Sequence, residues 1–222
     1  MIPKTIHFCW LSGETMPAKM RRCRASWRRH LPGYAYALWD WRRVEACRAE
    51  SGFDFAWVRH WYERKNYAFA ADYLRLWALW REGGIYLDVD VEVLKPFDAL
   101  LARGLLLGEE GGTGDVEAAV IGAEKGSAAI RAVLDSFGEP TAETLPKRMR
   151  RVLAGLPLLP CDYFSARDWR TGRLMVTERT YAVHHFAGSW LCRKERAARW
   201  AGQRLGAWAV PVVRWIGHRF ET

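Results

Sequence analysis

Strand-like and helix-like segments alternate through the first 95 residues, and this alternation limits the fold more than any other feature of the sequence. In the clearest helix-like segment the apolar residues recur three and four apart, whereas the strand-like segments are short and apolar. Strands that alternate with helices form largely parallel sheets with helices on their faces. We therefore predict an α/β fold from the order strand, helix, strand, helix, strand over residues 4–10, 16–33, 34–40, 66–84 and 85–94.

The rest of the chain continues the pattern less regularly. Strands are expected within 104–110 and 117–124, and a helix within 127–137. The 222 residues contain no repeat and no low-complexity linker, which favours one domain. We predict a domain over residues 1–190, followed by a basic, tryptophan-rich tail over residues 191–222.

Cysteine usage and apolar runs bear on the compartment. The five cysteines are odd in number and form no Cys-x-x-Cys pair, which argues against a disulfide framework and against a zinc site. The N-terminus has no signal-peptide pattern, and no apolar run reaches the ~18 residues of a membrane span. A cytoplasmic protein is the expectation.

The net charge of +9 lies mainly at the two ends of the chain. Residues 1–31 hold seven Lys or Arg against one acid, and residues 190–222 hold seven against two. Basic ends on a near-neutral body favour an anionic neighbour, either phospholipid or an acidic glycan, and a solvated basic surface is the alternative. No nucleic-acid-binding module is recognised, so nucleic acid is not an expected partner.

Two aspartates interrupt the last of these strand-like segments. Asp88 and Asp90 stand two apart in an apolar run, so on a regular strand both would face one side of the sheet, together with Tyr86. Two close carboxylates repel each other unless a cation lies between them, and carboxylate oxygens suit Mn²⁺ or Mg²⁺. Such an ion would in turn hold a diphosphate. A bare Asp-x-Asp is common, so this motif alone is weak evidence.

The preceding helix adds a second polar pair. Asp72 and Arg75 are three apart and share one face of the helix, among apolar residues that favour packing against the sheet. A surface ion pair would contribute little, and that alternative fits poorly with the apolar neighbours. Gly83 and Gly84 then end the helix and lead directly into the aspartate-bearing segment.

The segment that contains both polar pairs resembles a known family. Residues 64–96, RKNYAFAADYLRLWALWREGGIYLDVDVEVLKP, are similar to the signature block of glycosyltransferase family 32. This family includes fungal initiating α-1,6-mannosyltransferases, bacterial capsule and lipopolysaccharide glycosyltransferases, and relatives of the clostridial glucosylating toxins. Three more segments resemble the family in the same order: IPKTIHFCWLSG, LPGYAYALWD and HHFAGSW. The resemblance is strong over residues 1–100 and loose over 105–190.

The resemblance implies a GT-A fold, a Rossmann-like sheet that binds a nucleotide sugar with a divalent metal on the Asp-x-Asp motif. Asp90 would be the direct metal ligand, and Asp88 would contact the ribose, the donor sugar or the metal through water. His185 is the candidate third ligand, and His184 is the less favoured of the two histidines. The catalytic candidates are Asp88, Asp90 and Arg75.

The same resemblance implies a donor-binding set. Asp72 and Arg75 would hold donor-sugar hydroxyls and the diphosphate, and Tyr86 would line the sugar pocket. Trp10 would stack near the base at the end of the first strand, where ligands of such sheets bind. Ser189 and Trp190 resemble a mobile-loop pair that closes on the leaving diphosphate.

One position departs from the family pattern. Relatives usually carry an asparagine close to the donor sugar in the segment that here reads VEAAVIGA. Ala118 and Ala119 occupy that place, which leaves the donor sugar open. The chain is also short for the family.

The predicted function is that of a metal-dependent retaining glycosyltransferase. It would move a hexose from a UDP- or GDP-hexose to a glycan or glycolipid in surface polysaccharide or glycoconjugate synthesis. Alternatives are transfer to a protein acceptor and a non-catalytic membrane- or glycan-binding module. A haloacid-dehalogenase-type phosphatase is disfavoured because Glu92 stands where those enzymes carry Thr or Val.

The tail from Leu191 pairs basic residues with Trp200, Trp208 and Trp215. A basic amphipathic helix with tryptophans is typical of an interfacial membrane anchor, although Pro211 would kink it. We predict peripheral binding of this tail to an anionic membrane, on the inner face. The alternative is that the tail packs on the domain.

Overall fold

A computed structural model of the chain describes residues 1–141, 143–168 and 171–187. The predicted boundary at residue 190 and the predicted tail over 191–222 therefore lie outside the described residues.

The centre of the molecule is a five-stranded sheet in the order β2-β1-β3-β6-β5. Strand β1 pairs in parallel with both β2 and β3, whereas β6 pairs antiparallel with β3 and with β5. Four strands therefore run in one direction and only β6 runs against them, as the prediction of a largely parallel sheet requires. The strands span Ala35–Trp39 (β2), Thr5–Cys9 (β1), Gly84–Leu87 (β3), Val120–Ala123 (β6) and Leu105–Leu106 (β5).

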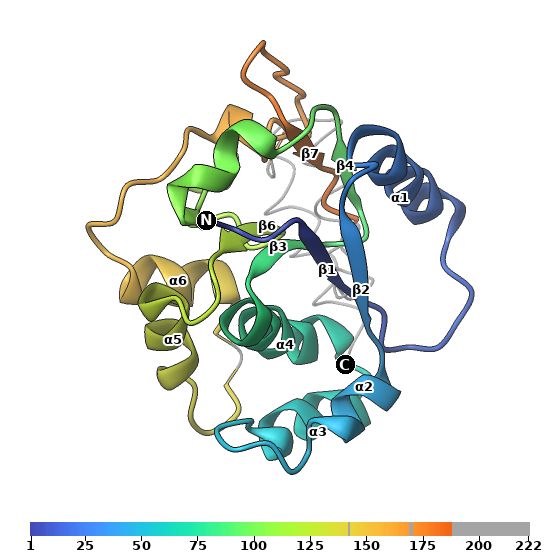
Figure 1. Cartoon of the computed structure of the whole chain (residues 1–222), viewed down its shortest axis with the longest axis vertical. Helices are drawn as coiled ribbons and strands as arrows, with labels where there is room; N and C mark the ends of the chain where they lie inside the picture. The colour runs from blue at the N-terminus through green and yellow to red at the C-terminus, as the bar shows by residue number, and fades with distance from the viewer. Residues whose placement is uncertain (142, 169–170, 188–222) are drawn as a thin grey trace, which may run out of the picture.

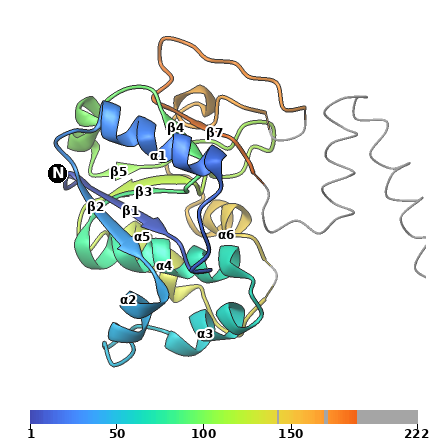
Figure 2. The ribbon, with the colours of Figure 1, turned by 90° about the vertical axis from the view of Figure 1, so that its right-hand side faces the viewer.

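Helices cover one face of this sheet (Figures 1 and 2). Helix α4 lies against the sheet, and nine of its 16 residues are buried, so it belongs to the core. The helices α2, α3, α5 and α6 surround it and share its apolar cluster. They span Tyr67–Glu82 (α4), Trp41–Ala46 (α2), Phe55–Glu63 (α3), Ala128–Asp135 (α5) and Leu145–Val152 (α6).

The opposite face carries helix α1 and a small second sheet (Figure 2). Helix α1, Ala18–His30, packs on β4, and β4 pairs antiparallel with β7. These elements and the main sheet enclose a second apolar cluster, so the domain has three layers. The small sheet comprises Val91–Val93 (β4) and Ala182–His184 (β7), and two 3₁₀ turns lie at Asp98–Arg103 and Cys161–Tyr163.

The glycine pair after α4 makes the tight entry into β3. Gly83 and Gly84 have φ of +69° and +120°, values that side-chain-bearing residues rarely adopt. A Cβ atom on Gly84 would lie 2.6 Å from the carbonyl oxygen of Thr5. The predicted helix stop is confirmed, and it sets β3 directly beside β1.

Other details differ from the sequence prediction. Residues 85–94 form two short strands in two different sheets, because the chain turns after Leu87. The helices α2, α3 and α6 were not predicted. Among the described residues, no helix is long and apolar enough to span a membrane.

Candidate functional site

The two aspartates lie in the turn that links the main sheet to the small one. The amide of Asp88 donates to the carbonyl of Ala119 at 2.9 Å, and the amide of Val91 donates to the carbonyl of Asp88 at 3.0 Å. Neither aspartate is therefore inside a strand, which corrects the prediction of one continuous strand. Asp90 is 7% exposed, and its Oδ2 accepts a 2.6 Å hydrogen bond from the amide of Ala187. The turn places both carboxylates at the carboxyl end of β3, where ligands of α/β sheets bind.

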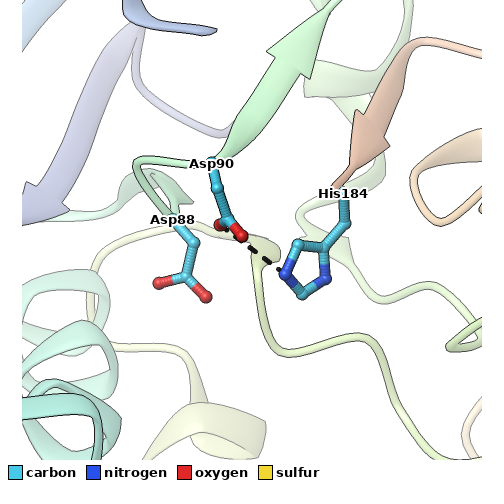
Figure 3. A group of neighbouring side chains, drawn as sticks. All are labelled: Asp88, Asp90 and His184. Atoms are coloured by element: carbon cyan, nitrogen blue, oxygen red, sulfur yellow. Dashed lines mark ion pairs between the residues drawn. The ribbon is translucent and has the colours of Figure 1, made fainter. Parts of the chain in front are cut away.

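A histidine from the far end of the chain completes this group (Figure 3). Strand β7 sets His184 opposite Val91, and one ligand atom each of Asp88, Asp90 and His184 lie within 4.8 Å of one another. Nε2 of His184 is 3.6 Å from Oδ1 of Asp90. The structure thus brings together three side chains, two carboxylates and one imidazole, of the types that bind Mn²⁺ or Mg²⁺.

The structure places His184, and not the predicted third ligand His185, in this group. Nε2 of His185 lies 2.8 Å from Oε2 of Glu92, outside the aspartate group. Successive side chains of an extended chain point to opposite sides, so when His184 faces Asp90 its neighbour faces away. Sequence alone gave two adjacent histidines without the register of β7 on β4.

Sequence reasoning missed Glu117, which lies behind His184. This carboxylate is fully buried, and its two oxygens are 3.1 and 3.2 Å from Nδ1 of His184. Oε1 also accepts from the amide of Ala119 at 2.8 Å. Because Nδ1 donates a hydrogen bond to this carboxylate, Nε2 is the atom that faces Asp90. A carboxylate behind the ring is the arrangement that orients histidine ligands of metals. The only sequence signal was a glutamate in a strand-like run.

His184 and Glu117 each favour the charged form of the other. Burial disfavours the charged form of His184, but Glu117 and Asp90 outweigh burial and raise its pKa to about 9. Burial likewise opposes the ionisation of Glu117, and His184 outweighs it and lowers the pKa of Glu117. The carboxylates around His184 make this a place that favours positive charge, and a divalent cation held by Asp88, Asp90 and His184 would displace the proton from Nε2 of His184.

Arg75 lies beneath the aspartates and is held by protein groups. It is 4% exposed, and Nη2 forms an ion pair with Oδ1 of Asp72 at 3.0 Å, while Nη1 donates to Asp88 at 3.3 Å and to the carbonyl of Ala118 at 2.6 Å. Its guanidinium carbon is 4.6 Å from the centre of the Tyr86 ring, and Tyr86 itself donates to Asp88 at 2.9 Å. Arg75 therefore positions Asp88 and Asp72, whereas sequence reasoning assigned it to the diphosphate.

Burial and a neighbouring carboxylate shift the ionisation of this group. Burial disfavours a charge on Arg75, but Asp88, Tyr86 and Asp72 together raise its pKa, so it stays cationic. Burial raises the pKa of Asp72 to about 7, although Arg75 acts in the opposite direction. Asp72 can therefore change its charge near neutral pH.

These residues form one wall of a cleft of about 790 Å³. Trp10, Asp72, Arg75, Tyr86, Asp88 and Asp90, all predicted site residues, line it. The indole nitrogen of Trp10 donates to the carbonyl of Glu14 at 2.7 Å, which fixes the ring at the rim. The predicted pair Ser189 and Trp190 lies outside the described residues.

The cleft also contains groups that the sequence did not single out. Glu110 and Asp115 line it on one side, and Lys65 and Lys147 line it as well. Burial and the charge of Glu117 raise the pKa of Glu110 to about 7. Ala118 and Ala119 line the cleft, so they offer methyl groups where the resemblance implies an amide.

Comparisons with known proteins agree with this geometry. Residues 17–106 match the family model described as "Glycosyltransferase sugar-binding region containing DXD motif". The chain is 36% identical over 101 residues to "Inositol phosphoceramide mannosyltransferase 3" of Schizosaccharomyces pombe, covering 45% of this chain and 27% of that protein. It is 31% identical over 117 residues to "Subversion of eukaryotic traffic protein A" of Legionella pneumophila, covering 43% of this chain and 18% of that protein. The chain thus spans about a quarter or less of these two relatives.

A solved structure shares the fold. "PaToxG Glycosyltransferase" superposes with a TM-score of 0.54 at 20% identity, covering 68% of each chain. The sheet order, the aspartate turn at the end of β3 and this likeness identify the GT-A fold, as predicted. Residues 17–106 of this chain are thus similar to the DXD-containing sugar-binding region of glycosyltransferases.

Proposed function

We propose that the chain is a metal-dependent glycosyltransferase that transfers a hexose from a nucleotide sugar. The observation that carries this proposal is the group of Asp88, Asp90 and His184 at one end of a cleft at the carboxyl ends of the central strands. Asp90, Asp88 and His184 would hold Mn²⁺ or Mg²⁺. When bound, the cation supplies positive charge that neutralises the diphosphate leaving group.

The surrounding residues hold the donor and the site in place. Tyr86 and Arg75 fix the carboxylate of Asp88, and Glu117 fixes the ring of His184. The Asp72 carboxyl lines the cleft, where it would accept hydrogen bonds from sugar hydroxyls. Fixed charges of this kind cost no reorganisation during the reaction.

The finer features of the activity extend the family resemblance. The donor is a UDP- or GDP-hexose, the configuration of the sugar is retained, and the acceptor is a glycan or glycolipid in surface polysaccharide or glycoconjugate synthesis. The name of one relative specifies a mannosyltransferase acting on an inositol phosphoceramide, which favours a lipid-linked acceptor here. A protein acceptor is the second candidate. The enzyme would work in the cytoplasm, on the inner face of the membrane.

A donor screen tests the proposal. Purified protein is incubated with UDP- and GDP-hexoses and Mn²⁺ or Mg²⁺, and release of the nucleotide is measured. We expect one donor to be turned over, chelator to abolish turnover, and Asp90→Asn to lower it by at least about a hundredfold. Asp98→Asn, which alters an exposed ion pair with Lys4, is the matched control. Equal turnover by Asp90→Asn, or donor binding without turnover, would favour a non-catalytic binding module.

A further inference from the structure

The outer face of α1 is a basic surface. Its 13 residues include six Lys or Arg and no Asp or Glu. Within the described ranges, no carboxylate lies within ion-pairing distance of any of the six. Five of them are exposed: Lys19, Arg21, Arg22, Arg28 and Arg29.

Two arginines at the opposite end of the molecule do have carboxylate partners. Helices α2 and α3 lie at the lower end of Figures 1 and 2, and α1 lies toward the upper end. On α3, Arg59 contacts Glu63 at 2.6 Å, and beyond α2, Arg48 lies 3.9 Å from Glu45. Among the described residues Arg42 and Arg64 at that end also have no ion pair, so α1 is distinguished by having no carboxylate partner for any of its six basic residues.

Exposed apolar side chains occur at the same end as α1. Leu174, Met175 and Val176 are consecutive, and they are 47%, 42% and 51% exposed. They lie in the segment 171–181, which forms the top of the molecule in both views. This segment is held in place, since the amide of Met175 donates to the carbonyl of Ala166 at 2.7 Å. Exposed Arg173 and Arg179 flank the three apolar residues.

We propose that α1 and the segment 171–181 form a docking surface for an anionic lipid bilayer. Basic side chains attract acidic headgroups, and exposed apolar side chains enter the interface between headgroups and acyl chains. The apolar triplet favours a membrane over a soluble polyanion such as a nucleic acid, which would gain nothing from it. On α1 the exposed residues are only Lys, Arg and Ala, which suits diffuse attraction to headgroups and offers no aromatic ring for stacking on bases.

The docking surface adjoins the cleft. Pro17, directly before α1, and Met20, in its first turn, both line the cleft. A bilayer against α1 would therefore lie at the rim of the site, within reach of a lipid-linked acceptor. This last consequence rests on the proposed function, whereas lipid binding itself does not.

Vesicle co-sedimentation of the full chain tests the docking surface. The first variant changes Lys19, Arg22, Arg28 and Arg29 to Gln. The matched control changes Arg42, Arg48, Arg59 and Arg64 to Gln, which removes the same charge from α2, α3 and their flanks. Each basic residue near an anionic surface contributes roughly a fivefold gain in affinity.

We expect the wild type and the control to bind phosphatidylcholine vesicles that contain about 30% phosphatidylglycerol, an anionic lipid. The α1 variant should bind them at least tenfold more weakly, and salt should weaken the wild type. A variant with Leu174, Met175 and Val176 changed to Ser should also bind more weakly, with an unchanged salt dependence.

Three outcomes would overturn the inference. Wild-type protein that stays in the supernatant has no such surface, and equal binding by the α1 variant and the control places the lipid contact elsewhere. Binding of heparin or RNA, lost in the α1 variant, without binding to vesicles would assign the face to a soluble polyanion. The turnover rate of a soluble donor by the α1 variant is measured as well. An unchanged rate, together with lost vesicle binding, shows that the docking surface and the proposed enzymatic activity are tested separately.

Discussion

Replacement of Arg75 by Lys should destabilise the domain strongly. Lysine keeps the positive charge but lacks the planar fork that reaches Asp72, Asp88 and the carbonyl of Ala118 at once. An ammonium group cannot reach all three acceptors from one position, so at least one carboxylate near it loses its partner.

The expected loss of stability follows from the burial of Arg75 and its two carboxylate partners. The side chain of Arg75 is 5% exposed, and those of Asp72 and Asp88 are 16% and 28% exposed. Each unsatisfied buried partner costs about 1–3 kcal/mol, and removal of one member of a buried ion pair costs about 3–5 kcal/mol. We therefore expect a loss of about 2–5 kcal/mol, which corresponds to roughly 5–15 °C in Tm for a chain of this size.

Thermal unfolding followed by circular dichroism and urea titration measures this loss. The matched control is Arg59→Lys, because the Arg59–Glu63 pair is more than half exposed on both sides and should change stability by less than about 0.5 kcal/mol. A melting temperature of Arg75→Lys within about 2 °C of wild type, together with lost donor turnover, would refute the positioning role. Arg75 would then contact the diphosphate, as the resemblance first implied.

Three further predictions follow from the same contacts. Glu117→Gln should weaken Mn²⁺ binding by about 10–100-fold in isothermal titration calorimetry, because the amide orients the ring of His184 less well. An effect on Mn²⁺ binding no larger than that of the exposed Glu124→Gln would contradict this. Burial raises the pKa of Asp72 to about 7, so the stability of the wild type relative to Asp72→Asn should be present below about pH 4 and lost as the pH rises through 7. Urea titrations of both proteins between pH 4 and pH 8 measure this. A constant difference in the free energy of unfolding would show that this carboxyl does not titrate in that range. Gly84→Ala should cost at least about 2 kcal/mol, since it combines φ of +120° with a 2.6 Å approach to a carbonyl, whereas Gly33→Ala meets no neighbour within 4 Å and should be tolerated.

The sequence predicted the parts of the fold that local patterns determine. Helix α4 and the glycine stop were evident because apolar spacing and left-handed glycines are local signals. The short helices α2 and α6, of six and eight residues, were not predicted. The break at Asp88 was also missed, since an Asp-x-Asp turn between two strands has the same alternation as one long strand.

The site was predictable where residues lie close together in the sequence. Asp72, Tyr86, Asp88 and Asp90 meet in one cleft because α4 and β3 are consecutive. The third member of the metal group depends on β7 pairing with β4 across more than ninety residues, and no local pattern sets that register. The same long-range pairing sets His184 in front of Glu117, so sequence reasoning favoured His185 and did not single out Glu117.

The metal group is the central claim, and binding of Mn²⁺ tests it most directly. Electron paramagnetic resonance counts free Mn²⁺ during titration of the wild type and of the variants Asp90→Asn, His184→Asn and His185→Asn. We predict one tight ion per wild-type chain, in the presence of UDP or GDP, and the same ion in His185→Asn. Asp90→Asn and His184→Asn should lose it. Retention of the ion by His184→Asn with loss in His185→Asn, or an ion bound equally by all four proteins, would contradict the account.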